Sequence, residues 1–312
     1  MRRIKYIDEI YKQKWQKWKF FCLVIVPAIL ILITNSCLLT NIEGAELTSV
    51  GLTFPSTDSL KITYKNIDAS NFPYIVSHVT VTNDIGFVIE KLDENNFEVR
   101  EDSVRELPIE VVELFDPKID VNVVLTIDQS NSMRGQPIQD ARAAASMFVG
   151  LMQGKDQAAI VSFAREPNII HLFSNDKDSL TAAISGINIE GGTAIFDALI
   201  CSADLTRSIL KNRVIILMTD GGDNSSQYSY EEALNTLISL EVRVFTIGLG
   251  LERDSSEERV LKNLAGATGG IYYYSPTSSD LEEIYRAISM LLHHRYRISY
   301  TTHNPAKDGT LR

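Results

Sequence analysis

Between Asp120 and Leu292, short and largely apolar runs alternate with segments of helical periodicity. Three of these runs are VNVVLTI, RVIILMT and VRVFTIGLG. Continuous apolar runs are typical of parallel strands that are buried on both faces, because helices then cover both sides of the sheet. The alternation therefore predicts an α/β fold, with a doubly wound and mostly parallel six-stranded sheet flanked by helices.

The other elements of this domain, residues 119–293, follow from the same patterns. Further strands are expected at 158–164, 169–173 and 271–275, with 169–173 as the hairpin partner of 158–164. Helices are expected at 137–151, 178–187, 194–210, 230–240, 256–264 and 278–292. In open α/β sheets, ligands bind beyond the carboxyl ends of the strands.

Residues 45–118 show a different pattern, in which short runs rich in Val, Ile, Thr and aromatic residues lie between turn residues. The candidate strands are SLKITYKN, YIVSHVTVTN, FVIEKL, NFEVRE and LPIEVVELF. They predict a small all-β domain, an immunoglobulin-like sandwich that precedes the α/β domain. The tail, residues 294–312, alternates again, with Tyr296, Ile298 and Tyr300 on one face. A strand without a sheet would leave its backbone groups unpaired, so we expect the tail to join residues 45–118 in one sandwich into which the α/β domain is inserted. The alternative is that the tail starts a separate domain.

The N-terminus combines a basic segment, residues 1–19, with an uncharged apolar one, residues 20–39. About 20 apolar residues are needed to span a bilayer as a helix. The pattern predicts a single-pass signal anchor with a cytoplasmic N-terminus, which would place the α/β domain outside the cell membrane. The alternative is a cleaved lipoprotein signal, with Cys37 as the lipidated residue.

The charge and the cysteines exclude two further classes. The formal net charge of -10 argues against a nucleic-acid-binding protein, which needs a basic surface to neutralise phosphates. Of the three cysteines, only Cys201 lies beyond the N-terminal apolar stretch, so the folded part has no intrachain disulfide framework. Nothing in the sequence indicates an oligomeric state.

Three polar segments stand at the places where ligands bind in this fold class. DQSNS (128–132) follows VNVVLTI, GGT (191–193) precedes a predicted helix, and DGGD (220–223) follows RVIILMT. A structural alternative is that Asp128 and Asp220 merely cap the helices that follow them. Asp223 and Asn224 are expected on an exposed loop.

In this order and at these strand ends, DxSxS, GGT and TDG resemble the motif of von Willebrand factor A (vWA) and integrin I domains, which have a Rossmann-like fold. The resemblance covers about residues 119–293 and fills every position of a complete metal-ion-dependent adhesion site (MIDAS). With the N-terminal segment, it points to the bacterial membrane-anchored type. It implies that Ser130, Ser132 and Thr193 bind the metal directly and that Asp128 and Asp220 hold its water ligands.

The resemblance also implies the ion and the partner. Hard divalent cations prefer oxygen ligands, so Mg²⁺ is expected, with Mn²⁺ or Ca²⁺ as alternatives. The implied partner is a protein that offers an Asp or Glu carboxylate to the ion. In integrin I domains, the threonine that corresponds to Thr193 changes between direct and water-mediated metal contact as the last helix moves, which implies a switch.

Two other functional classes remain at this point. One is an assembly or regulatory subunit of a membrane-associated protein complex. The other is a metal-dependent hydrolase, which is disfavoured because none of the five histidines falls in the three motif segments as a general base. We therefore expect a binding protein and not an enzyme.

Overall fold

The computed structural model describes residues 30–32, 60–83, 85–101, 104–115, 120–209 and 211–303. The chain divides into two compact units. The first, called the α/β unit below, comprises residues 82–88 and 115–294. The second, called the β unit, comprises residues 1–81, 89–114 and 295–312.

The α/β unit contains a six-stranded sheet with the strand order β12-β11-β10-β7-β8-β9. Its strands are β7 (Asn122–Asp128), β8 (Gln157–Phe163), β9 (Pro167–Ser174), β10 (Arg213–Thr219), β11 (Arg243–Leu249) and β12 (Tyr272–Ser275). Every neighbouring pair is parallel except β8 and β9, which are antiparallel. The predicted mostly parallel six-stranded sheet is confirmed, including the hairpin at its edge.

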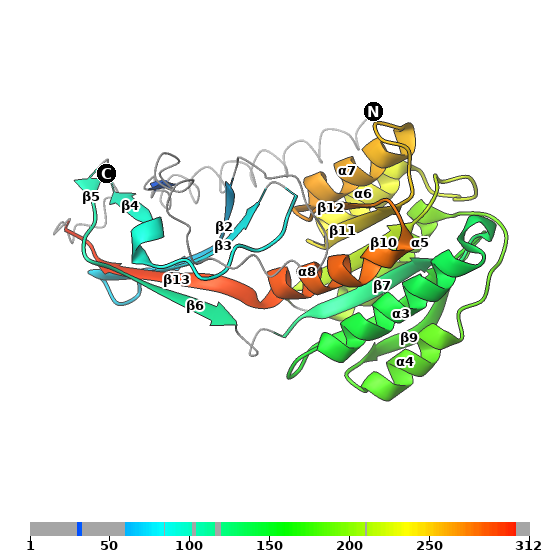
Figure 1. Cartoon of the computed structure of the whole chain (residues 1–312), viewed down its shortest axis with the longest axis horizontal. Helices are drawn as coiled ribbons and strands as arrows, with labels where there is room; N and C mark the ends of the chain where they lie inside the picture. Colours follow the sequence, from blue (N-terminus) through cyan, green and yellow to red (C-terminus); the bar gives the residue numbers. More distant parts are fainter. Residues whose placement is uncertain are drawn as a thin grey trace, which may run out of the picture. The chain divides into compact units, whose positions relative to one another are not determined.

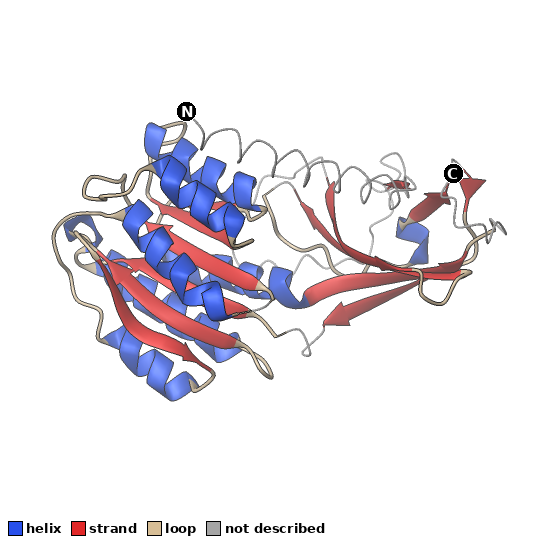
Figure 2. Ribbon diagram, turned by 180° about the vertical axis from the view of Figure 1, so that it is seen from behind, coloured by secondary structure: helices blue, strands red, loops and turns tan. Residues whose placement is uncertain are grey.

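Helices cover both faces of this sheet (Figures 1 and 2). They are α3 (Gln136–Leu151), α4 (Lys177–Ser185), α5 (Ile195–Leu205), α6 (Tyr230–Ser239), α7 (Ser256–Thr268) and α8 (Leu281–His293). Local sequence sets several of their ends. Ser229 and Glu232 form a capping box at the start of α6, and Ser255 caps α7. α7 runs four residues past its predicted end because Gly269, with a φ of 76°, is the left-handed residue that stops it.

The central strands are buried on both faces because alternate side chains point to opposite sides of a strand. In β7, Leu125 and Ile127 pack with α3 and α8, whereas Val124 packs with α5 on the other face. Burying each such side chain stabilises the fold by roughly 1.5–3 kcal/mol. The spacing predicted for the inner face of α8 is also confirmed. Its buried apolar residues include Leu281, Ile284, Ile288, Leu291 and Leu292.

The β unit is built around a four-stranded sheet with the order β2-β3-β13-β6. The strands are β2 (Leu60–Asp68), β3 (Tyr74–Asn83), β6 (Ile109–Phe115) and β13 (His294–Thr301). β13 is the tail strand, and it pairs antiparallel with β3, with Ile298 opposite Ser77. A second sheet joins β1 (Leu30–Leu32), β4 (Glu98–Glu101) and β5 (Val104–Arg105). η1 (Glu94–Asn96) is a short 3₁₀ turn before β4.

The expectation of a sandwich that precedes the α/β domain is not supported. The four-stranded sheet takes strands from both sides of the α/β unit in sequence, because β13 lies between β3 and β6. The segment FVIEKL, expected to be a strand, forms only an isolated bridge between Val88 and Thr82. Local alternation identifies a strand but not its partner. The expectation that the tail strand joins the β segments on the other side of the inserted α/β domain is confirmed, because β13 pairs with β3.

The predicted membrane helix at 20–39 is not supported either. This segment lies outside the described residues except for 30–32, which form β1 and pair with β4. Within the described part of the chain, no helix has the length and apolar character that a membrane span requires. The basic segment 1–19 also lies outside the described residues.

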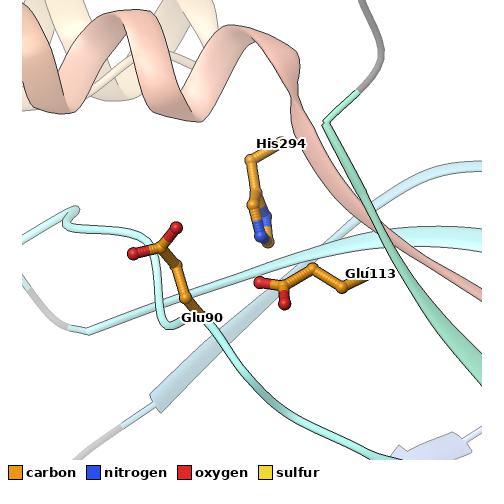
Figure 3. Close-up of side chains that lie close together, drawn as sticks. All are labelled: Glu90, Glu113 and His294. Atoms are coloured by element: carbon orange, nitrogen blue, oxygen red, sulfur yellow. The ribbon is translucent and has the colours of Figure 1, made fainter. Parts of the chain in front are cut away.

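The core of the β unit forms around the tail strand. Tyr296, Ile298 and Tyr300 are at most 3% exposed and pack with apolar side chains of the other strands. The Tyr296 hydroxyl accepts from the Leu92 N–H at 3.1 Å and lies 3.1 Å from Glu113 Oε1. Figure 3 shows Glu113 beside Glu90, and a carboxylate oxygen of one lies within 4.8 Å of a carboxylate oxygen of the other. The figure also labels His294, the first residue of β13. Apolar and polar contacts therefore both tie β13 into this sheet.

A chain that ends at His294 is expected to lose the fold of the β unit but not that of the α/β unit. Without β13, the edges of β3 and β6 are exposed and the core loses three large side chains. Ending at His294 keeps His293, whose Nε2 lies 2.9 Å from Asp156 Oδ2 in the α/β unit. Hydrogen exchange should show β3 unprotected and β7 protected. If β3 keeps its protection, β13 does not hold this sheet together.

Candidate metal centre

Asp128 is the last residue of β7, and its carboxylate is fully buried. Oδ1 accepts from the Ser130 N–H at 2.7 Å, and Oδ2 accepts from the Thr219 hydroxyl at 2.6 Å. Thr219 ends β10, the strand next to β7, so the carboxylate links two strand ends. Burial raises the pKa of Asp128 to about 6, and the hydrogen bonds from Thr219 and Ser130 oppose that rise.

Ser130, Ser132 and Asp220 form a continuous chain of hydrogen bonds. The two serine oxygens lie 2.9 Å apart, and the Ser132 hydroxyl donates to Asp220 Oδ1 at 2.8 Å. Ser130 precedes a 3₁₀ turn, η2 (Asn131–Met133), which turns the chain so that the two hydroxyls meet. Burial raises the pKa of Asp220 as well, against the hydrogen bond from Ser132.

Thr193 lies one residue before Ala194, the N-cap of α5, and is 5% exposed. Its loop is fixed to the ends of β7 and β8 by backbone hydrogen bonds. The Glu190 N–H donates to the Gln129 carbonyl at 2.8 Å, and the Ala194 N–H donates to the Ala164 carbonyl at 2.7 Å. The structure thus joins Asp128, Ser130, Ser132 and Asp220 directly, and places Thr193 in a loop fastened to the same edge.

The capping alternative for the two aspartates is wrong. The N-cap of α3 is Gly135, and that of α6 is Ser229. Asp128 and Asp220 instead direct their oxygens to serine and threonine groups at the strand ends.

The donor set fits a hard divalent cation. It contains only carboxylate and hydroxyl oxygens, and the carboxylates are held where burial disfavours their charge. A bound cation would offset that cost. The predicted residues that fit the role are Ser130, Ser132 and Thr193 as direct ligands, with Asp128 and Asp220 behind the ion's water molecules.

The loop that follows Asp220 has a role that the sequence did not predict. Asp223 was expected on an exposed loop, but it is half-buried and its carboxylate accepts from the Ile195 N–H at 2.7 Å. Ser226 and Asn224 make similar bonds to the segment around Thr193. The helix was predicted to begin at residue 194, where Thr193 would be its cap, whereas the structure has Ala194, which offers no side-chain oxygen, at the N-cap of α5.

A model of the von Willebrand factor type A domain matches residues 122–287, which is 166 of the 312 residues. The chain belongs to the von Willebrand factor type A family. The vWA match covers the six-stranded sheet and the whole candidate site, including Asp128, Thr193 and Asp220.

Two relatives are similar in sequence to part of this vWA protein. An uncharacterized protein of Synechocystis is 26% identical over 178 residues, 55% of this chain and 42% of that protein. Inter-alpha-trypsin inhibitor heavy chain H4 of Sus scrofa is 28% identical over 188 residues, 54% of this chain and 20% of that protein. The chain therefore spans less than half the length of either relative.

A solved structure shares the vWA fold. Proximal thread matrix protein 1 from the mussel byssus, solved with a zinc-occupied MIDAS motif, has a TM-score of 0.50 at 22% identity. The likeness covers 60% of this chain and 49% of that protein. At this identity, the likeness shows the fold alone.

Proposed function

We propose that the vWA domain is a divalent-cation-dependent protein-binding domain, not an enzyme. The observation that carries the proposal is the meeting of Asp128, Ser130, Ser132 and Asp220 at one edge of the sheet. These residues come from two different strand ends, and all of them present oxygen. Such a constellation fits an ion with an octahedral oxygen shell, and we propose Mg²⁺ as that ion.

The choice of ligands favours binding over catalysis. Ser130, Ser132 and Thr193 would contact the ion through neutral hydroxyls, so its positive charge would be poorly compensated. An Asp or Glu carboxylate from a partner protein is the group that such an ion attracts most strongly. Asp128 and Asp220 accept hydrogen bonds from Thr219 and the serines and would also bind the ion's waters, so neither is available as a general base.

The comparisons support a metal ion at this position. The mussel byssus protein was solved with zinc in its MIDAS motif.

We also propose that the domain is displayed outside the cell membrane. The support is the sequence of the N-terminus, a basic segment at 1–19 followed by an uncharged one at 20–39. Basic residues before an apolar span stay on the cytoplasmic side.

The direct test of the function is a measurement of water on the bound ion. The full chain is loaded with Mn²⁺, and the proton relaxation of water reports the water molecules on the ion. A short peptide containing one Glu should displace a water and lower the relaxation, because its carboxylate takes the open position. The matched control is the same peptide with Gln in place of Glu, which should have no effect. Equal binding of the Glu peptide in EDTA would refute a metal-mediated contact.

A further inference from the structure

The start of α5 is capped from a distant loop. The first N–H groups of a helix need partners outside the helix, and Ala194 at the N-cap offers none through its side chain. Asp223 Oδ2 accepts from the Ile195 N–H at 2.7 Å. Ser226 Oγ accepts from the next two N–H groups at 3.0 and 3.2 Å. A carboxylate at a helix N-terminus also interacts favourably with the helix dipole.

The contact between α5 and this loop is reciprocal. Asp197, in the first turn of α5, accepts from the Gln227 N–H at 3.0 Å and from the Tyr228 N–H at 2.9 Å. Asp197 is only 9% exposed, so water cannot easily replace its carboxylate as the acceptor for these backbone N–H groups. Two aspartates, one on each segment, thus hold the helix start and the loop together.

Thr193 is bonded to the same loop through both of its backbone groups. Its N–H donates to Asn224 Oδ1 at 2.9 Å. Its carbonyl accepts from the Asn224 N–H at 2.9 Å and from the Ser225 N–H at 3.2 Å. These bonds use only the backbone of Thr193, so they fix the position of its Cα without occupying the side-chain hydroxyl that would bind the metal.

The packing beside Thr193 is so close that residue 192 must be glycine. Gly192 has a φ of 90°, and a Cβ there would lie 2.8 Å from Ser225 Oγ and 3.0 Å from Arg165 Cα. A side-chain oxygen on one side and backbone on the other leave no room for a side chain, and the positive φ itself favours glycine. The loop and the GGT segment therefore form one tightly fitted body.

We propose that loop 221–229, named here the clamp loop, holds Thr193 in place as a metal ligand. Asp223 and Asp197 are its positioning residues. This inference rests on the proposed function of the site. Asp220 lies immediately before the clamp loop, so the clamp joins two segments that supply the ion's shell. A switch that moves Thr193 would have to move the clamp loop with it.

The test compares Mn²⁺ affinity in the full chain by isothermal titration calorimetry. Asp223→Ala removes the carboxylate that caps α5 and should weaken Mn²⁺ binding by about 10–100-fold, as loss of an outer-shell partner does. Asp223→Asn keeps one acceptor oxygen and should lose less. The matched control is Asp204→Ala. Asp204 is also on α5 but is 50% exposed and pairs with Arg207, so its removal should leave affinity unchanged.

A second readout separates positioning from general destabilisation. If Thr193 leaves the ion, a water replaces it, and proton relaxation by bound Mn²⁺ rises in Asp223→Ala. A role in stability alone would lower the unfolding temperature without changing the water on the bound ion. If Asp223→Ala folds and binds Mn²⁺ with wild-type affinity and hydration, the clamp is refuted.

Asn224→Ala covers the case in which Asp223→Ala does not fold. The Asn224 side chain is exposed and accepts from the Thr193 N–H, so its loss should weaken Mn²⁺ binding while sparing the cap of α5. Wild-type affinity in both Asn224→Ala and Asp223→Asn would overturn the proposal. Absence of Mn²⁺ binding in the wild type would instead refute the proposed function, and the clamp with it.

Discussion

A chain with both Ser130→Ala and Ser132→Ala is expected to lose Mn²⁺ binding while keeping its fold. Both hydroxyls lie in the hydrogen-bonded chain that ends at Asp220 Oδ1. Two direct ligands would be removed together, so the loss should exceed the roughly 10–100-fold that an outer-shell change costs. The hydrogen bonds lost from the fold itself are worth only about 1 kcal/mol each.

The measurement is a Mn²⁺ titration by calorimetry, with circular dichroism to verify the fold. The control is a chain with Ser185→Ala and Ser239→Ala, two exposed serines whose hydroxyls bond only to carbonyls of their own helices. This control should bind Mn²⁺ as the wild type does. A correctly folded double variant at 130 and 132 with unchanged affinity would show that the ion is held elsewhere.

The α/β sheet was predictable because the apolar sequence of its central strands indicates that they are buried. β7 and β10 are continuous apolar runs, and such runs fit only strands covered on both faces. Their carboxyl ends fall at one edge of a parallel sheet, so Asp128 and Asp220 could be placed together without knowing any contact. Physical rules of topology fixed that part of the site.

The β unit could not be predicted in the same way. β13 pairs with β3 across the whole α/β unit in sequence, and alternation in β13 is equally compatible with any sheet edge. The unpaired backbone groups of the tail indicated that it must join a sheet. They did not indicate the order of the strands in that sheet. The immunoglobulin-like sandwich was inferred from the short strands alone and is not supported.

The role of the clamp loop could not be predicted for a different reason. Asp223, Asn224 and Ser226 bond to backbone N–H groups of a segment about thirty residues away, and polar loop residues of this kind are usually solvated. The need of α5 for partners from elsewhere follows from the N-cap position of Ala194, which only the structure gives.

Asp128→Asn is expected to stabilise the metal-free protein at pH 7 while weakening its Mn²⁺ binding by roughly 10–100-fold and so reducing its stabilisation by metal. The Asp128 carboxylate is fully buried, and its pKa is raised from 3.8 to about 6 mainly by desolvation. A rise of this size corresponds to about 3 kcal/mol of destabilisation when the group is charged. Asparagine removes the charge, can still accept from the Ser130 N–H, and can donate to the Thr219 hydroxyl. The hydrogen bonds of the strand end are therefore preserved.

The sign of the pH dependence provides the sharpest check on this prediction. Because the pKa of Asp128 is higher in the folded state, the folded protein takes up a proton between about pH 6 and pH 4 that the unfolded chain does not. Asp128 should therefore contribute a gain in stability to the metal-free wild type as the pH falls through this window, against the loss contributed by carboxyl groups with lowered pKa values, such as Glu258. Asp128→Asn should lack this contribution and keep those of Asp220 and Glu283, whose pKa values are also raised by burial.

Urea unfolding in EDTA at pH 7 and pH 5, followed by circular dichroism of the helices, measures both chains. Their difference in unfolding free energy should be large at pH 7 and should shrink at pH 5, where Asp128 is mostly protonated. Adding Mn²⁺ at pH 7 should raise the stability of the wild type more than that of Asp128→Asn, and that rise should fade toward pH 5 because protons compete with the ion for the site. If Asp128→Asn is the less stable chain at pH 7 in EDTA, the buried carboxylate serves the fold and not the ion.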